Sequence, residues 1–416
     1  MSTAVLILLG FAWLAGFAAF AWTSHREGEY RASRIAFGVA VVVSLLFLLA
    51  TLLPPQAEWF VLGAVAVGIA VALVGFLLPV GRVERGEDVP QVRVDERDIM
   101  FARARLEPGS ADYQAYYAMR PEHKAGDDKT RSLPGLLASK GSAFHPLVFG
   151  ATDASFELTE ALRDAVDGPV GPVQAHLESE TITRYLKDLT RYHGAHSIGA
   201  TELEPYHVYT HIGRGSGQYG APVRLSHRFA LAFTVEMDHR LVGTAPYAPT
   251  VMESARQYVE AAKIAVQVAS FIRWLGYPAR AHIDGNYRVI APLVARDAGL
   301  GGIGRMGLLM TPSLGPRVRL GVVTTDLPLA RDQRIEDAAI LDFCQTCNKC
   351  AQCCPIHAIP DDDRQEIDGA LRWRINPDLC FRYWHAVGTD CGRCMSVCPY
   401  SHPDTTMHRL VRWAVR

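Results

Sequence analysis

The chain has 416 residues, of which 49% are hydrophobic and 20% are charged, and its formal net charge at pH 7 is -1. This length predicts two or three domains. Because the charges are balanced, nothing electrostatic favours a nucleic-acid partner, and none is expected. The average conceals two unlike parts, a strongly apolar N-terminal region and a sequence of ordinary soluble composition after it.

Three apolar runs near the N-terminus, residues 4–22, 35–53 and 59–80, are each long enough to cross a bilayer as a helix. The first run has no basic segment before it and two further runs follow, which disfavours a cleaved signal peptide. None of the three runs contains an ionisable side chain, whereas proton and ion pathways usually contain one. We therefore predict a three-span transmembrane anchor over residues 1–82.

The charges between the apolar runs predict the orientation of this anchor. The first loop, residues 23–34, carries three arginines, whereas the second loop, residues 54–58, has no lysine or arginine. Arg82 and Arg85 follow the third run. Loops rich in lysine and arginine stay on the cytoplasmic side. We expect the rest of the chain to face the cytoplasm, attached to the inner membrane, in a reducing compartment.

The soluble part begins with a charged stretch. Residues 83–131 carry many charges and are interrupted by proline and glycine, a composition typical of loops. Residues 83–176 are therefore predicted to form a linker and an N-terminal arm.

The middle of the chain, residues 177–335, alternates strand-like and helical patterns, which predicts a layered α/β domain. Residues 229–235 and 319–325 are apolar runs typical of strands. Between them, residues 251–275 are predicted to form one long helix, which Gly276 would end.

Two local motifs in this region are rejected as cofactor sites. Residues 299–304 spell Gly-Leu-Gly-Gly-Ile-Gly, but the dinucleotide fingerprint needs a strand before it and a helix after it, and the flanking patterns are the reverse. These glycines more plausibly let the backbone turn tightly or approach a flat ligand. Two histidine pairs would suit a metal on a helix, but their neighbours favour loop or strand, so we interpret them as core or solvated residues: His193 with His196, and His207 with His211.

All nine cysteines lie between Cys344 and Cys398, and eight of them follow the ligand spacing of a two-cluster bacterial ferredoxin. Each of the two runs ends in Cys-Pro. In such ferredoxins the last cysteine of each run binds the other cluster. The spacing therefore predicts two 4Fe-4S clusters. The first is assigned to Cys344, Cys347, Cys350 and Cys398, and the second to Cys354, Cys380, Cys391 and Cys394.

Zinc knuckles and disulfides are the competing interpretations of these cysteines. Neither explains the two Cys-Pro endings, and a disulfide framework is unusual in so large a chain with its cysteines in one short segment. Cys353, the ninth cysteine, has no place in the pattern and is predicted to be a small apolar residue beside a cluster.

Several further stretches carry a resemblance to a known family. Together with the cysteine segment they resemble the cobalamin-dependent reductive dehalogenases over about residues 95–403. The three-span anchor is similar to the membrane-anchored, cytoplasm-facing branch of that family. The stretches are residues 95–101, 189–199, 206–209, 258–277, 285–286, 298–301, 304–307, 311–312, 315–319 and 325–329.

The resemblance implies an α+β, nitroreductase-like core over residues 177–335 that binds a corrinoid, and a ferredoxin-like module over residues 336–416. It implies base-off cobalamin with no protein ligand to cobalt, and the D-x-H-x-x-G string of histidine-ligated cobalamin proteins is absent from the sequence. The implied corrinoid contacts are Gly299, Gly301, Gly304, Arg305, Gly315 and Arg317.

The same resemblance implies an oxidoreductase that removes halide from an organohalide. Tyr258, at the start of the long helix, is the implied proton donor, with Asn286 and Arg319 as its neighbours and Arg317 as the alternative arginine. A phenol has a pKa near 10, so a cation is needed to stabilise its anion, and Arg319 would supply it. The interval from Tyr277 to Asn286 is slightly longer than in the family pattern.

Two alternatives stay open at this point. Epoxyqueuosine reductase, a relative of the family, uses an aspartate that follows a strand, and Asp238 has that setting here. A non-enzymatic membrane electron carrier would need only the spans and the clusters, and would leave the α/β domain unexplained. The electron donor, whether a ferredoxin, a flavodoxin or a quinol-linked system, is not specified by the sequence.

Overall fold

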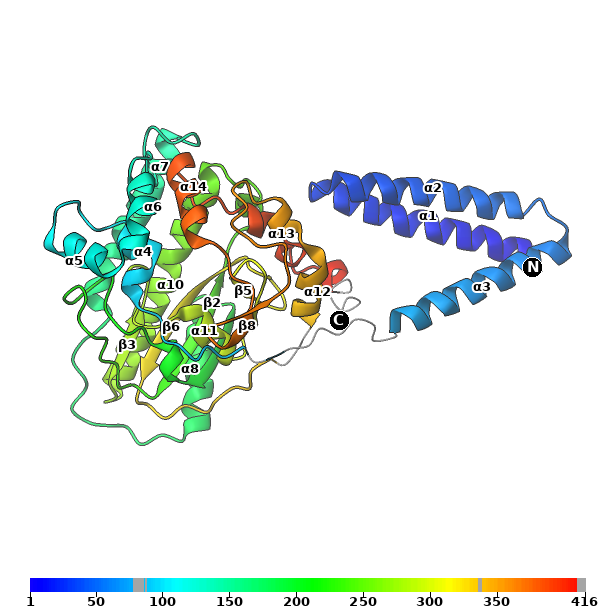
Figure 1. The fold of residues 1–416 in the computed structure, drawn as a ribbon. Coiled ribbons are helices and arrows are strands. Elements are labelled where there is room, and N and C mark those ends of the chain that lie inside the picture. The colour runs from blue at the N-terminus through cyan, green and yellow to red at the C-terminus, as the bar shows by residue number, and fades with distance from the viewer. Residues whose placement is uncertain (78–85, 87, 336–338, 410–416) are drawn as a thin grey trace. The chain divides into compact units, whose positions relative to one another are not determined.

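The structure, a computed structural model, describes residues 1–77, 86, 88–335 and 339–409. The chain divides into two compact units, residues 1–82 and 83–416 (Figure 1). Arg82 and Arg85, the end of the third predicted span, and the C-terminal tail from residue 410 lie outside the described residues. The second unit is not divided further at residue 176 or 335, so those two domain boundaries stay predictions.

The first unit consists of three helices, α1 (Ser2–Arg26), α2 (Tyr30–Ala50) and α3 (Pro55–Leu77). All three are long and apolar enough to cross a membrane. The three predicted apolar helices are therefore confirmed, and their role as a membrane anchor stays a prediction. Helices α1 and α2 pack along each other, with Leu6 buried against Phe47.

The helices of the first unit extend beyond the predicted spans. The loop expected over residues 23–34 shortens to residues 27–29. Glu58, expected in a loop, lies in the first turn of α3 and is only 3% exposed. An acidic side chain is favourable at a helix N-terminus, and this carboxylate accepts hydrogen bonds from the hydroxyls of Ser2 and Thr3.

The segment predicted as a linker and N-terminal arm, residues 83–176, is largely helical over residues 96–165. Its side chains are buried against the rest of the second unit, including Tyr116, Tyr117 and Phe149. The elements are η1 (Glu96–Asp98), α4 (Met100–Arg103), α5 (Ala111–Met119), α6 (Pro121–Arg131), α7 (Pro146–Ala161) and η2 (Leu162–Ala165).

The centre of the second unit is a four-stranded antiparallel sheet in the order β1-β2-β6-β3. The strands are β1 (Ser197–Glu202), β2 (Phe229–Glu236), β3 (Ala279–His282) and β6 (Val318–Thr325). In the register of β2 and β6, Leu231 lies opposite Val323 and Val235 lies opposite Arg319. The two predicted strands are confirmed, and the fold is the expected mixed α/β class with an antiparallel sheet.

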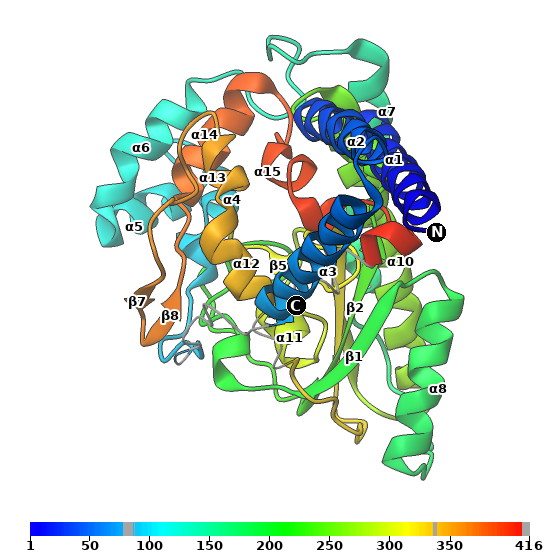
Figure 2. The same cartoon turned by 90° about the vertical axis from the view of Figure 1, so that its right-hand side faces the viewer.

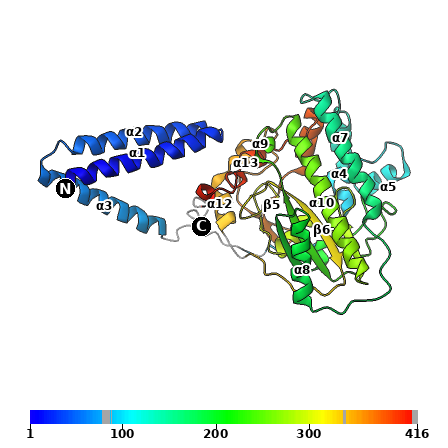
Figure 3. The same cartoon turned by 180° about the vertical axis from the view of Figure 1, so that it is seen from behind.

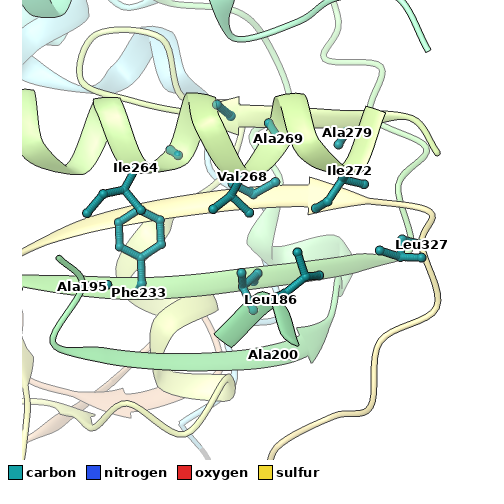
Figure 4. Packing of buried hydrophobic residues seen from close by; sticks show 14 of the residues in the cluster. Leu186, Ala195, Ala200, Phe233, Ile264, Val268, Ala269, Ile272, Ala279 and Leu327 are labelled. Carbon is teal, nitrogen blue, oxygen red and sulfur yellow. The ribbon is translucent and has the colours of Figure 1, made fainter. Parts of the chain in front are cut away.

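Helices cover both faces of this sheet, which explains why β2 is apolar at nearly every position rather than at every second one. Phe233 points toward Ile264 and Val268 on α10 (Ala248–Trp274), and α8 (Ser179–Tyr192) adds Leu186 to the same core (Figures 3 and 4). On the other face, Ala232 packs with Val294 of α11 (Ala291–Asp297). Helix α10 confirms the predicted long helix, and Gly276 follows it with φ of +84°.

The glycine-rich segment after α11 forms a small hairpin of β4 (Gly302–Ile303) and β5 (Leu309–Met310). A helix therefore precedes these glycines and a strand follows them, as predicted when the dinucleotide fingerprint was rejected. The remaining short helices of the core are η3 (Pro205–His207) and α9 (His239–Val242).

The C-terminal module contains two similar turns. Asn348 and Gly392, each directly after a cysteine, adopt left-handed conformations with φ of +49° and +69° and begin the one-turn helices α13 and α15, which contact each other (Figure 2). The described elements are α12 (Ala339–Cys347), α13 (Lys349–Gln352), β7 (Gln365–Ile367), β8 (Ala370–Arg372), α14 (Pro377–Val387), α15 (Arg393–Ser396) and η4 (Pro399–Ser401).

Candidate active site

The structure brings the cysteines together in the two groups that the spacing predicts. In the first group, burial raises the pKa of the Cys398 thiol, and the thiols of Cys344, Cys347 and Cys350 raise it further. Burial and then Cys344 raise the pKa of Cys350 to about 12. Cys398 is far from the other three in the sequence, so only the fold places it beside them.

The second group is assembled in the same way. Burial, followed by Cys391 and Cys354, raises the pKa of Cys380 to about 12. Cys394 has a pKa well above its usual value because it is buried beside Cys380 and Cys391. Cys353 is half-buried, and its Sγ lies 3.4 Å from the carbonyl oxygen of Cys350.

These groups fit iron–sulfur clusters chemically. Thiols with such high pKa values stay protonated at neutral pH, whereas iron binds the thiolate and supplies the positive charge that a buried thiolate lacks. Apolar side chains, including Met310, Ile340 and Trp373, surround the first group. Cluster ligation by these cysteines stays a prediction that this arrangement supports.

Arg305 and Arg317 hold the cysteine module to the core instead of lining a ligand site. Arg305 is 1% exposed. Its Nε lies 3.0 Å from the carbonyl oxygen of Cys344, and its other nitrogens bond the carbonyls of Gln345, Pro360 and Asp362. Arg317 is equally buried and bonds the carbonyl of Ser401 and the carboxylate of Glu236. Neither arginine is among the residues that line the cavity described below, so their corrinoid contact stays a prediction that these contacts do not support.

The four glycines expected to contact the corrinoid also face the chain itself. A Cβ at any of them would lie within 2.6 Å of protein atoms. At Gly301 the obstacle is the carbonyl oxygen of Met310, and at Gly315 it is Tyr400 of the cysteine module. These positions require glycine for close packing. The four are Gly299, Gly301, Gly304 and Gly315.

A cavity of about 220 Å³ lies between the sheet, α10, α11 and the small hairpin. Its lining divides into an apolar wall and a group of tyrosines and arginines. The apolar wall contains Val289, Ala291, Pro292, Leu308, Leu309, Pro316, Val318 and Leu320. The aromatic and charged side contains Tyr209, Arg214, Tyr258, Tyr287 and Arg319.

Tyr258 lies in the third turn of α10, not at the start of the helix as predicted. The guanidinium carbon of Arg319 lies 5.0 Å from the centre of its ring, a cation–π distance. Burial raises the pKa of Tyr258; Arg319 opposes the rise and Asp284 adds to it. Arg319 thus acts in the predicted direction, but burial outweighs it, so the phenol is a protonated acid at neutral pH.

Arg319 itself is held by groups from distant parts of the chain. Its Nη2 lies 2.7 Å from Ser254 Oγ on α10 and 3.2 Å from Asp390 Oδ2, in the cysteine module. Its Nη1 lies 3.3 Å from the sulfur of Met237. These contacts keep the guanidinium at the cavity.

Arg214 is a cavity residue that the sequence did not indicate. It is held by Glu96, which accepts hydrogen bonds from the backbone N–H groups of Gly213 and Arg214 and pairs with the guanidinium at 3.2 Å. Glu96 comes from the segment predicted to be a linker. The one available signal was the match of residues 95–101 to the arm of the reductive dehalogenases.

Asn286 does not reach the cavity. It is fully buried, and its Oδ1 accepts hydrogen bonds from Arg280 at 2.9 Å and from Ser216 at 3.2 Å. Asp284, two residues earlier, is the residue whose charge acts on Tyr258 and Arg319. Neither Asp284 nor Asn286 is among the residues that line the cavity, so the role of Asn286 beside Tyr258 stays a prediction that its buried contacts do not support.

Asp238 and the paired histidines have structural roles. Asp238 caps α9 by accepting hydrogen bonds from the backbone N–H groups of Arg240 and Leu241. The Asp238 carboxylate is therefore occupied by the helix cap, and Asp238 is not among the residues that line the cavity. His207 is buried, as expected, and its Nε2 lies 2.8 Å from Asp297 Oδ2.

The cavity fits a corrinoid in two respects. Among the described residues that line it there is no histidine, cysteine or methionine, so a cobalt ion there would have no imidazole or sulfur ligand from these residues. Leu308 of the apolar wall packs against two buried clusters. One contains Cys344, Cys350 and Cys398 of the first cysteine group, and the other contains Met395, beside which Cys394 of the second group also packs. A cofactor at this wall would therefore lie beside the cysteine module.

The 4Fe-4S dicluster domain family matches residues 343–402. Over 188 residues the chain is 34% identical to a tetrachloroethene reductive dehalogenase of Sulfurospirillum multivorans, covering 44% of this chain and 37% of that protein. A tetrachloroethene reductive dehalogenase of Desulfitobacterium hafniense is 33% identical over 197 residues, covering 45% and 35%. An epoxyqueuosine reductase of Lactococcus garvieae is 30% identical over 113 residues, covering 26% and 31%.

Among solved structures, the catabolic reductive dehalogenase NpRdhA in complex with 3-bromo-4-hydroxybenzoic acid has a TM-score of 0.64 and 26% identity, covering 81% of this chain and 46% of that chain. A reductive dehalogenase whose structure suggests a mechanism for B12-dependent dehalogenation matches with the same score and identity, covering 80% and 45%. The chain spans less than half the length of these relatives. In sequence and in fold, the chain is a relative of the reductive dehalogenases, and epoxyqueuosine reductase is a more distant relative.

Proposed function

We propose that the protein is a membrane-anchored reductive dehalogenase that uses cobalamin and two 4Fe-4S clusters to remove halide from a small organohalide. One observation carries the proposal. Two groups of four cysteines lie next to a cavity in which a protonated tyrosine is held beside an arginine. The groups that would supply electrons, the cysteine-held clusters, and the group that would supply the proton, the tyrosine, therefore lie at the same cavity.

The net reaction needs two electrons and one proton: the carbon–halogen bond breaks, a carbon–hydrogen bond forms, and halide leaves. The two cysteine groups would hold clusters that carry electrons from a donor, and whether this donor is a ferredoxin, a flavodoxin or a quinol-linked system is not specified by the sequence. A bound corrinoid would supply the low-potential metal centre for the reaction. The cysteine module lies next to the cavity, because Leu308 of the cavity wall packs against the buried cluster that contains Cys344, Cys350 and Cys398.

Tyr258 would supply the proton. The burial that raises its pKa keeps the phenol protonated until substrate arrives, and Arg319 beside the ring stabilises the phenolate that forms as the proton leaves. Arg319 keeps its own proton throughout. The apolar wall excludes water, which strengthens this electrostatic effect.

The proposed location is the inner membrane, with residues 83–416 facing the cytoplasm. The support is the three apolar helices and the positive charge at the junction of α1 and α2, where Arg26, Arg31 and Arg34 lie. Labelling single introduced cysteines at residues 28 and 52 in intact cells would test the orientation: residue 28 is expected to be protected and residue 52 accessible from outside.

Anaerobic purification in detergent, with cobalt, iron and corrinoid quantified together, tests the function. We expect about one cobalt for about eight iron, and halide release from a panel of organohalides with a low-potential reductant. A full iron content without corrinoid, even after reconstitution with cobalamin, would contradict the proposal and favour an electron carrier.

A further inference from the structure

Asp390 connects the two halves of this site. It lies directly before Cys391 in the cysteine module, and its side chain is turned toward the core, where it is only 9% exposed. Its Oδ2 accepts hydrogen bonds from Ser254 Oγ and from Arg319 Nη2. Ser254 Oγ in turn accepts from Arg319 Nη2 at 2.7 Å. Aspartate, serine and arginine therefore form a closed triangle.

The loop that carries Asp390 is fixed on both sides. The hydroxyl of Thr389 donates to the carbonyl of Pro246 at 2.7 Å. Cys391 and Gly392 both have left-handed conformations, with φ of +57° and +69°, and a Cβ at Gly392 would lie 2.7 Å from Thr250 on α10. A displacement of the loop would therefore move Cys391 and Asp390 together.

Two buried polar atoms of this triangle make no hydrogen bond within the described residues. Asp390 Oδ1 and Arg319 Nε have no hydrogen-bond partner among the described residues. Burying such groups costs free energy, and buried unsatisfied groups in folded proteins call for an explanation such as a redox or catalytic role. The single charge of Asp390 lies between a cysteine of the second group and the guanidinium at Tyr258.

We propose that Asp390 is a positioning residue that couples the second iron–sulfur cluster to the proton-donating side of the cavity. Through its carboxylate it holds Arg319 beside the Tyr258 ring, and through the peptide bond to Cys391 it ties that arrangement to the cluster. This inference rests on the proposed function. Each electron that enters the cluster adds one negative charge beside Asp390 and Arg319, so cluster reduction and the field at Tyr258 are linked. The influence of Asp390 on the pKa values of Tyr258 and Arg319 agrees with this placement.

Asp390→Asn in the full-length holoenzyme tests the coupling. Iron content is expected to stay at the wild-type level, and the reduction potential of one cluster should rise, because a negative charge that opposed reduction is removed. We expect kcat to fall by about 10- to 100-fold as Arg319 loses its anchor, with KM within about twofold of wild type. Asp361→Asn removes an exposed charge from the same module and should leave kcat unchanged.

Two further variants keep the test decisive. Arg319→Gln should lower the potential of the same cluster, and its shift should not add to that of Asp390→Asn in the double variant. This readout needs no substrate, so it tests the coupling even if the wild-type protein releases no halide, a result that would contradict the proposed function alone. Ser254→Ala breaks the triangle without changing charge and should lower kcat with unchanged iron content, even if Asp390→Asn fails to assemble clusters.

The proposal would be overturned by additive potential shifts, by wild-type kcat in Ser254→Ala, or by an Asp390→Asn variant that changes the potential alone or kcat alone. The first result would show that Asp390 and Arg319 act on the cluster independently. The others would place Asp390 with the cluster or with the cavity, but not with both.

Discussion

The cysteine module and the cavity are built in opposite ways. Seven of the eight predicted ligands lie in two short runs, residues 344–354 and 391–398, and each run contains a local left-handed turn, at Asn348 and at Gly392. The cavity takes Arg214, Tyr258, Tyr287 and Arg319 from four separate segments of the chain. The ligands of a metal cluster recur at a fixed spacing in the sequence. The residues of a cavity have no fixed spacing, because the fold brings them together from distant segments.

The arginines show the same contrast. Arg305 and Arg317 come from the glycine-rich segments that seemed suited to a ligand, yet their donors bond backbone carbonyls inside the protein. Arg214 and Arg319 are held by carboxylates, and they line the cavity. Arg317 also pairs with the carboxylate of Glu236, so the position of the guanidinium at the cavity, and not the type of partner, distinguishes the two kinds of arginine.

The largest expected effect comes from the cysteine module. Cys394→Ala should lose about half of the iron and all halide release, because electrons no longer reach the cavity. Cys353→Ala is the matched control and should keep the wild-type iron content. Iron analysis and visible absorption of the anaerobic proteins measure both. Full iron in Cys394→Ala would contradict the ligand assignment.

The next effect belongs to the cavity. Tyr258→Phe should lower kcat by about 100-fold or more, the usual range for a lost general acid, with unchanged iron and corrinoid content. Tyr287→Phe removes a hydroxyl from the same cavity and should cost much less. Steady-state halide release compares the two. Equal losses would show that Tyr258 contributes to the shape of the cavity and not to proton transfer.

Arg305→Gln is expected to lower the free energy of unfolding by about 3 kcal/mol or more, because several buried carbonyls lose a charged donor. Arg319→Gln should mainly lower kcat. Urea unfolding of the iron-loaded proteins, followed by loss of visible absorption, separates the two outcomes. Similar midpoints for Arg305→Gln and wild type would remove the distinction between structural and cavity arginines.

The smallest effect is expected from pH. The pKa of Tyr258 is raised above its usual value of about 10 by burial, and a group is protonated below its pKa. The acid form should therefore persist across neutral and mildly alkaline pH, so kcat should show no fall assignable to Tyr258 between about pH 6 and 9. A falling limb near pH 8 that disappears in Tyr258→Phe would mean that Arg319 dominates over burial.

The arm shows why part of the fold was not predictable. Residues 83–131 have a charged, interrupted composition, yet they form helices whose tyrosines and Glu96 are buried. Charged residues look solvated in a sequence, but Glu96 is buried because it bonds Arg214 and two backbone N–H groups. That compensation depends on a partner more than one hundred residues away.

The sequence alone determined the elements that depend on local order: the three apolar spans, strands β2 and β6, helix α10, and the cysteine spacing. Apolar run length and ligand spacing are properties of contiguous residues. Tertiary structure decided which charged side chains line the cavity, because it adds Arg214 to the predicted Arg319. It also brings Asp390 of the cysteine module to Arg319. The physical reason is that the role of a polar side chain depends on its burial and its partners, and those partners lie elsewhere in the chain.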